Sequence, residues 1–211
     1  MSPPTLRSPP ATVPLALQPL TRAAFARFGT AIENPGGAAE SANQGTAQKH
    51  ARIAPVTAAY PPAAPRASQN LNLFSCAPRA LPASGVFAVT ILERHPYTPQ
   101  TFIPLALSVA PDAPSFYVVI VAPTCARTGM PRLAELAAFR CHGGQAVTYA
   151  AGTWHAPMVV VGAARVDFCV LVAENGVPDD DCQEVLIGGG GVGVKVLEPS
   201  WGLWQKPASR L

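Results

Sequence analysis

The sequence predicts a mainly β fold in which short strands pack into a sandwich or a barrel of the jelly-roll kind. From residue 71 onward, strand-like apolar segments follow one another, each bounded by Gly, Pro, Asn or Asp. No helix alternates with successive strands, which excludes a doubly wound parallel sheet. Many short strands with turn residues between them are typical of antiparallel sandwiches and barrels. The predicted strands cover residues 71–74, 86–93, 101–107, 115–121, 146–149, 158–161, 166–172 and 192–197.

Two short helices are expected around these strands. Thr21 can cap a helix that runs to Phe28, with Phe25 and Phe28 on one side and Gly29 as its stop. A second helix is predicted over residues 131–140, because this segment opens with proline, carries apolar residues at helical spacing and is followed by glycine.

The composition indicates one domain that spans residues 1–211. An apolar fraction of 49% allows a sizeable core. Charged residues make up only 13% of the chain, against roughly a quarter in ordinary soluble domains, so part of the surface is expected to be covered by a partner subunit. The net charge of +3 comes from scattered residues without a basic run, which argues against a nucleic-acid partner. The longest apolar stretches, such as 116–122, are too short to cross a membrane.

The cysteines and both ends of the chain bear on the compartment. Five cysteines without a C-x-x-C pair predict reduced thiols in an intracellular protein. Residues 1–12 are rich in proline and are expected to form a disordered lead-in that is no targeting peptide. The final tripeptide, Ser209-Arg210-Leu211, is a variant of the S-K-L peroxisomal address. Either the cytoplasm or the peroxisome is therefore expected.

Residues 92–105, L-E-R-H-P-Y-T-P-Q-T-F-I-P-L, hold the first candidates for chemistry. Glu93 and His95 stand two apart on a predicted strand and so share one face, while Arg94 points to the other face, where we expect a surface or interface ion pair. Gln100 follows five residues after His95. An acid and an imidazole on one face can bind a metal, move a proton or hold a polar ligand.

Residues 144–155 hold a second imidazole, His155, after a turn at Gly152. This segment resembles the second motif of the cupin superfamily, with Ala150 where proline is usual and Val159 where asparagine is usual. Residues 93–100 occupy the places of the first cupin motif, which carries H-x-H and then an acid. The resemblance implies a cupin-like double-stranded β-helix, a jelly-roll barrel with a few short peripheral helices, in which His155 faces the first segment.

Glu93, His95 and His155 together form a set of two imidazoles and one carboxylate that suits Zn, Ni or Fe. Gln100 stands where the superfamily carries an acid, and a neutral amide is a poorer ligand for a divalent ion. Proton transfer by the two histidines is therefore the first expectation, and one divalent ion, Ni or Zn, is conditional. Which imidazole is the acid and which the base stays open. His142 is expected to interact with the end of the 131–140 helix.

Longer motifs resemble one family. They are E-R-H-P-x-x-x-Q-x-F-I-P at 93–104, G-x-x-V-x-Y-x-x-x-x-W-H-x-P at 144–157, D-F at 167–168, D-C-x-E at 181–184, N-x-G-T-A-x-K at 43–49 and L-Q-P-L-T-x-x-A-F at 17–25. Together they are similar to the ureidoglycolate lyase family, formerly called ureidoglycolate hydrolases, of allantoin degradation.

The resemblance implies a single lyase domain, usually a homodimer, that cleaves (S)-ureidoglycolate to glyoxylate and urea without an organic cofactor. It makes Lys49 a candidate cation for the substrate carboxylate and Asn43 and Gln100 candidate partners for the urea group. Two positions depart from many relatives: Ala156 replaces a second histidine, and Ser75 stands near a position that is often Arg or Lys.

Two other functions remain compatible with these residues. An amidohydrolase would attack the urea carbonyl with an activated water and release ammonia. A cupin without catalytic activity would use the same carboxylate and imidazoles to bind a small acid.

Overall fold

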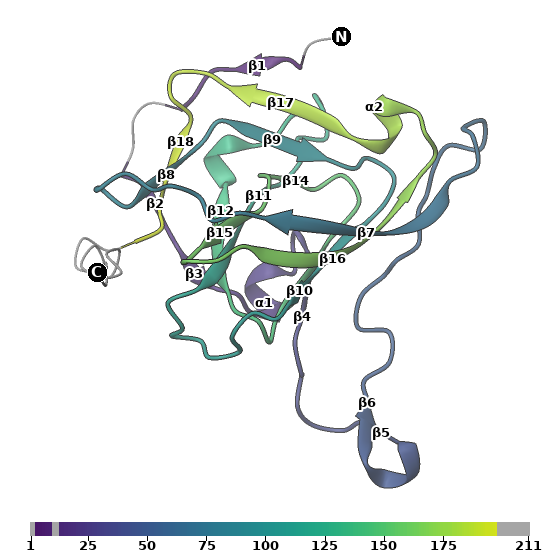
Figure 1. Ribbon diagram of the computed structural model, residues 1–211. Coiled ribbons are helices and arrows are strands. Elements are labelled where there is room, and N and C mark those ends of the chain that lie inside the picture. The colour runs from purple at the N-terminus through teal and green to yellow at the C-terminus, as the bar shows by residue number, and fades with distance from the viewer. Residues whose placement is uncertain (1–2, 10–12, 198–211) are drawn as a thin grey trace.

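The computed structural model describes residues 3–9 and 13–197, whose strands form four β-sheets (Figure 1). The first sheet has the order β1 (Thr5–Leu6), β17 (Gln183–Ile187), β9 (Ile91–Arg94), β14 (Trp154–His155), β11 (Phe116–Ala122), β12 (Ala137–Cys141) and β3 (Gln18–Pro19), and β15 (Val159–Val161) also pairs with β11. The second has the order β4 (Gly29–Ile32), β13 (Ala146–Tyr149), β10 (Gln100–Leu105), β16 (Val166–Glu174) and β7 (Ser68–Cys76).

Two smaller sheets and four short helical turns complete the described fold. The third sheet has the order β2 (Leu15–Ala16), β18 (Val192–Lys195) and β8 (Val86–Val89), and the fourth is the hairpin of β5 (Glu40–Ala42) and β6 (Ala47–Lys49). The α-helices are α1 (Arg22–Phe25) and α2 (Pro178–Asp181), and the 3₁₀ turns are η1 (Asn43–Gly45) and η2 (Leu133–Glu135).

Strand β11 separates two hydrophobic cores. Its odd-numbered residues, such as Tyr117 and Val119, pack in a core shared by the two large sheets, together with Phe168 of β16. Its even-numbered residues, such as Val118 and Ile120, pack in a second core with the three-stranded sheet. Because both faces are buried, the strand reads as a continuous apolar run. The predicted mainly β, cupin-like fold is confirmed as a β-sandwich.

Every predicted strand overlaps an observed one: residues 146–149 coincide with β13, and the other segments differ from the observed strands at one end or both. The segment 86–93 contains two strands, β8 and β9, and β7 extends from Ser68 to Cys76, well beyond the predicted 71–74. β16 alternates buried even positions with partly exposed odd ones over most of its length, which is the pattern of a sheet with one covered face.

The predicted helix over 131–140 is wrong. Only Leu133–Glu135 forms a helical turn, and Ala137–Cys141 is strand β12, hydrogen-bonded between β11 and β3. Pairing with two neighbouring strands outweighs the helix preference of the alanine, leucine and glutamate residues in this segment, because tertiary contacts override local propensity. His142 therefore does not end a helix: it lies in a turn, where its Nδ1 accepts a hydrogen bond from the Gly144 amide at 3.1 Å.

The expected disorder of residues 1–12 is also wrong for the part that the structure describes. Thr5–Leu6 runs parallel to Leu186–Ile187 at the edge of the first sheet. The amides of Leu186 and Gly188 donate to the carbonyls of Pro4 and Leu6, each at 2.9 Å. An edge strand has unpaired backbone groups, and this short segment satisfies them.

Other expectations fall outside what the structure tests. Residues 209–211 lie outside the described part of the chain. The five cysteines are free thiols. In the described ranges, no helix is long and apolar enough to cross a membrane.

Helix α1 is shorter than predicted but capped as expected. The Thr21 side chain accepts a hydrogen bond from the Ala24 amide at 3.1 Å, and the helix ends at Phe25. The Phe25 ring packs edge-on against Phe139 at 5.3 Å between centroids.

Removing this cap should cost a measurable amount of stability. Thr21→Ala leaves the Ala24 amide without its side-chain acceptor, and we expect a loss of about 1 kcal/mol in the free energy of unfolding. Denaturant titration measures the loss. Thr21→Ser, which keeps the hydroxyl, should remain close to wild type, and an equal loss in both variants would contradict the capping role.

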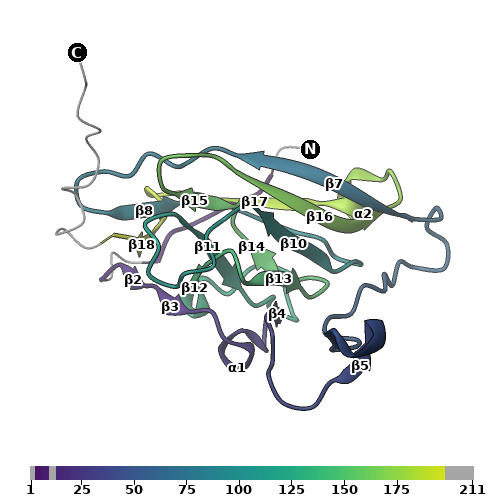
Figure 2. The same cartoon turned by 60° about the horizontal axis from the view of Figure 1, so that its bottom comes forward.

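One segment stands apart from the sandwich. Residues 33–67, here called the arm, connect β4 to β7 and carry the hairpin β5/β6. Figures 1 and 2 show the hairpin projecting from the body in both orientations.

Candidate active site

Glu93, His95 and His155 converge inside the sandwich. Strand β14 pairs with β9 so that His155 lies opposite Glu93, and β14 also pairs with β11, opposite Val121. One nitrogen or oxygen atom from each of the three side chains lies within 4.8 Å of the others. The structure thus brings together the two segments that the sequence analysis paired.

The strand alternation places Arg94 on the other side, as predicted. Its Nε and Nη2 donate to Oε1 of Gln183 at 2.9 and 2.7 Å, and its guanidinium lies 4.8 Å from the centre of the Trp154 ring. Within the described residues of one chain, an amide and an indole take the place of the expected surface ion pair, and an ion pair at an interface stays a prediction.

A glycine turn connects the two histidine segments. Gly152 adopts a φ of 78°, a conformation that side chains rarely tolerate. Its amide donates to the His95 carbonyl at 2.7 Å, and its carbonyl accepts from the hydroxyl of Thr124. The chain then enters β14 and delivers His155.

His155 is almost fully buried, with 1% of its surface exposed. Its Nδ1 lies 2.9 Å from the Thr153 carbonyl, and a carbonyl can only accept, so Nδ1 carries a proton. Its Nε2 lies 3.5 Å from Oε1 of Glu93. The Tyr149 ring stacks on the imidazole at 4.1 Å and 13°. Tyr149 is a positioning residue that sequence reasoning missed, although it stands in the G-x-x-V-x-Y motif.

His95 is oriented in the same way. Its Nδ1 donates to the carbonyl of Asp181, which leaves Nε2 for the site. The Asp181 carboxylate in turn accepts hydrogen bonds from the amides of Asn175 and Gly176, both at 2.7 Å. Asp181 belongs to the D-C-x-E motif, but nothing in that motif indicated that its main chain would position a histidine.

Three buried polar atoms at this place have no hydrogen-bond partner within the described protein: Nε2 of His95, Nε2 of His155 and Oε1 of Gln100. A neutral Nε2 presents a lone pair, and a lone pair beside the Glu93 carboxylate is unfavourable. A shared proton or a cation therefore belongs between these groups. The donor set of two imidazoles, each tied through Nδ1 to a carbonyl, also fits a divalent metal ion.

The electrostatics of the cluster favour a charged Glu93 and a neutral His95. Burial raises the pKa of Glu93, but the polar contact with His155 at 3.5 Å and the charges of His155 and His95 outweigh it, so the net pKa is lowered. Burial, followed by the charge of His155, lowers the pKa of His95. The Asp181 carbonyl, Glu93 and Gln100 oppose that shift, although Oε1 of Gln100 makes no hydrogen bond of regular geometry.

These shifts predict that acid destabilises the metal-free protein. The unfolded chain binds a proton at His95 below its ordinary pKa of 6.5, whereas the folded chain binds it only at lower pH. Glu93 acts in the same direction below its ordinary 4.5. The free energy of unfolding should therefore fall as the pH falls below about 6.5.

Denaturant titrations at several pH values, with chelator present, test this dependence. His95→Gln should remove the part of the slope that lies just below pH 6.5 and leave the more acidic part. An unchanged slope in this variant would contradict a depressed pKa for His95.

Two predicted substrate contacts are not at the cluster. Asn43 and Lys49 lie on the arm, where Lys49 pairs with Glu40 at 3.2 Å across the hairpin. His50 follows in the same segment. Gln100, in contrast, is 4% exposed and lies opposite Tyr149 of the neighbouring strand, at the site.

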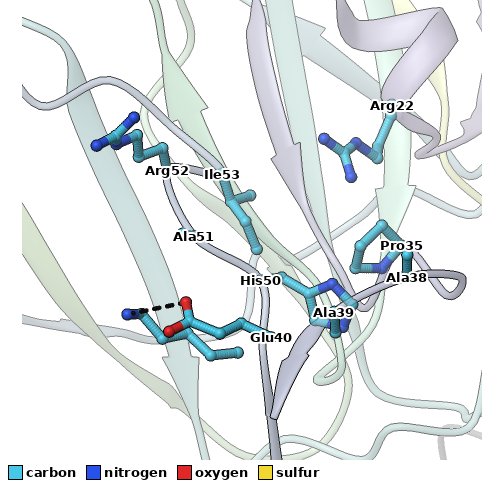
Figure 3. Close-up of a pocket in the computed structure, with 10 residues that line it drawn as sticks. Arg22, Pro35, Ala38, Ala39, Glu40, His50, Ala51, Arg52 and Ile53 are labelled. Atoms are coloured by element: carbon cyan, nitrogen blue, oxygen red, sulfur yellow. Dashed lines mark ion pairs between the residues drawn. The ribbon is translucent and has the colours of Figure 1, made fainter. Parts of the chain in front are cut away.

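A hollow of about 440 Å³ lies beside the arm and not at the cluster. Figure 3 shows its lining, with the ion pair of Glu40 as a dashed line. The residues that line it include the cations Arg22, Lys49 and Arg52, together with His50. The cluster is the candidate active site, because it brings a carboxylate and two imidazoles together within 4.8 Å, and the Nε2 atoms of both imidazoles have no hydrogen-bond partner among the described residues.

Comparison with known sequences decides the family. The sequence pattern described as ureidoglycolate lyase matches residues 12–193. The chain belongs to the ureidoglycolate lyase family. A relative named ureidoglycolate lyase from Schizosaccharomyces pombe is 40% identical over 79% of this chain and 87% of its own length. Others are 36% identical (Saccharomyces cerevisiae; 82% of this chain, 93% of its own length) and 34% identical (Burkholderia cepacia; 92% of both chains).

The predicted resemblance to the ureidoglycolate lyase family is thus confirmed over most of the chain. Both histidine segments and the arm lie within the matched residues.

Proposed function

We propose that this chain is a ureidoglycolate lyase that cleaves (S)-ureidoglycolate to glyoxylate and urea in purine catabolism. The observation that carries the proposal is the cluster of Glu93, His95 and the buried His155 in a chain of this family. The cluster offers a carboxylate and two imidazoles whose Nε2 atoms have no partner among the described residues.

The substrate is a carbinolamide, whose central carbon carries a hydroxyl, a carboxylate and a ureido nitrogen. Its cleavage needs a base for the hydroxyl proton and an acid for the departing nitrogen. As the hydroxyl proton leaves, its oxygen forms the carbonyl of glyoxylate and the bond from carbon to nitrogen breaks. The nitrogen then takes up a proton and leaves as urea.

The surroundings of the two imidazoles support different roles. The lowered pKa of His95 keeps it neutral near pH 7, as a base must be. A proton on Nε2 of His155 would be shared with Glu93, which suits the acid. Gln100 would accept a hydrogen bond from the urea group, which is supported by its buried Oε1 without a partner among the described residues.

A divalent ion, nickel or zinc, would be held by Glu93, His95 and His155. When bound, it would lower the pKa of the substrate hydroxyl. Tyr149 and the Asp181 carbonyl have the same roles with or without a bound ion, since they hold the imidazoles in place.

We also propose that the chain is one lyase domain, 1–211, that works as a homodimer. The low fraction of charged residues, 13%, favours a covered surface. Ser209-Arg210-Leu211 supports a peroxisomal location. A fluorescent reporter that ends in this tripeptide should gather in peroxisomes, and a diffuse signal would exclude the address.

Product analysis tests the proposed reaction. Purified protein given ureidoglycolate should release urea and glyoxylate in equal amounts without ammonia. Ammonia release would establish the amidohydrolase instead, and binding without turnover would establish a ligand-binding cupin.

A further inference from the structure

We propose that the arm of one protomer completes the active site of a second copy of the chain and places Lys49 against the carboxylate of the substrate. The inference rests on the proposed function and extends it to the origin of the missing cation. Five observations support it.

The first observation is the charge balance of the cluster. A substrate with a carboxylate calls for a cationic partner at its binding site. The charged side chains that shift the pKa values of Glu93 and His95 are one another and His155, and none of these would hold a carboxylate beside the anionic Glu93. Arg94 is the nearest cation in sequence, and it is turned away toward Gln183 and Trp154. The cluster of a single protomer is therefore incomplete for this substrate.

The second observation is the form of the arm. Strands β5 and β6 pair with each other and with no other described strand. Lys49 ends the hairpin with 58% of its side chain exposed, beside Glu40. Figure 1 shows the hairpin extending beyond the body of the protomer, as expected of an arm that reaches another subunit.

The third observation is backbone strain at the tip of the hairpin. Asn43 and Gln44 have φ values of 48° and 59°, in the left-handed region that costs free energy for residues other than glycine. Such conformations persist where the surroundings impose them, often at ligand sites. The hairpin pairs with no other described strand, so a partner subunit would supply such surroundings.

The fourth observation is that the arm is hydrogen-bonded to the sandwich beside the site, at Ala59 and Tyr60. The Tyr60 hydroxyl donates to the Ala173 carbonyl at 2.8 Å and to Oδ1 of Asp181 at 3.0 Å, and the Ala59 amide donates to the Tyr97 carbonyl at 2.7 Å. Asp181 is the residue whose carbonyl orients His95. The root of the arm and the rim of the site are thus one hydrogen-bonded structure.

The fifth observation is an apolar sheet face next to this root. Leu71 and Leu73 point outward from β7 with 70% and 64% of their surfaces exposed, and Ile103 lies in register with Leu73 two strands away. Gln69, on the same face, donates to the Val56 carbonyl of the arm at 2.7 Å. A second copy related by a two-fold axis would bury this apolar sheet face on each protomer. It would also bring the arm of each protomer to the sandwich of its partner.

Mixed dimers test the exchange. Lys49→Ala and His155→Gln chains with different affinity tags are coexpressed, and the heterodimer is isolated by two successive purifications. If the arm acts across the dimer, one site combines an intact cluster with an intact Lys49, and the heterodimer should regain roughly half of the wild-type rate. If each arm serves its own protomer, both sites are damaged, and the heterodimer will be no more active than the two variants.

Kinetics of the separate Lys49 variants add a second readout. Lys49→Ala should raise KM for ureidoglycolate more than it lowers kcat, and Lys49→Arg should restore part of the loss. Lys195→Ala, which removes a half-buried lysine of β18 whose Nζ donates to the Ser84 carbonyl, is the control outside the arm and should match wild type in KM. A normal KM in Lys49→Ala overturns the proposal, as does an active wild type that is monomeric by light scattering. A wild type that releases no urea refutes the proposed function instead.

Discussion

Replacing His155 by glutamine is expected to lower kcat for urea release by roughly a hundredfold to ten-thousandfold, the usual contribution of a positioned acid or base. The side chain is 1% exposed and its Nε2 faces Glu93 at 3.5 Å. Glutamine preserves much of the volume and the polarity of the position but cannot deliver a proton at neutral pH. Steady-state assays of urea and glyoxylate measure the loss.

His142→Gln is the matched control, because it makes the same substitution at an imidazole that lies in a turn outside the cluster. Both variants should keep the circular dichroism spectrum of the wild type. If His155→Gln retains more than about a tenth of the wild-type kcat, an essential acid–base role for this imidazole is excluded.

Replacing Glu93 by glutamine is expected to lower kcat/KM by at least roughly a hundredfold. The change removes the only carboxylate of the three-residue cluster in the described residues and leaves an amide of the same shape. A proton on His155 then loses its counter-charge, and a divalent ion loses its anionic ligand. The loss is expected in both cases.

Metal analysis separates these two roles of Glu93. If an ion is bound, wild-type protein should contain one per chain, chelation should abolish activity, and Glu93→Gln should bind the ion roughly ten- to a hundredfold more weakly. If chelation leaves the rate unchanged, the carboxylate acts on His155 alone. Glu184→Gln provides the control. Glu184 lies opposite Glu93 in the register of the neighbouring strand β17, but its side chain is exposed.

Some of the site was predictable because it depends on local alternation and on motif spacing. Glu93 and His95 share a face through the two-residue period of a strand, and this period also turns Arg94 away. Gly152 predicts a turn because glycine tolerates its positive φ of 78°. A family resemblance that covers both segments was sufficient to predict that His155 faces Glu93 and His95.

Other features depend on partners that are distant in the sequence. Residues 137–141 read as a helix by themselves and form β12 only because β11 and β3 pair with both of their edges. The Asp181 carbonyl reaches His95 across 86 positions of the chain. The motif of Lys49 predicted a contact with the substrate. The motif could not predict that Lys49 lies on the arm, away from the cluster of its own protomer, because that position depends on the tertiary structure.

The sequence by itself determined the strand-rich fold and the chemistry of the cluster, because apolar alternation, turn residues and donor types are local properties of the chain. Only the tertiary structure decided which nitrogen of each imidazole faces the site, which aromatic ring stacks on His155 and where Lys49 lies. The physical reason is that these features are set by strand register and by carbonyls from other strands, and register is a balance of contacts over the whole sandwich.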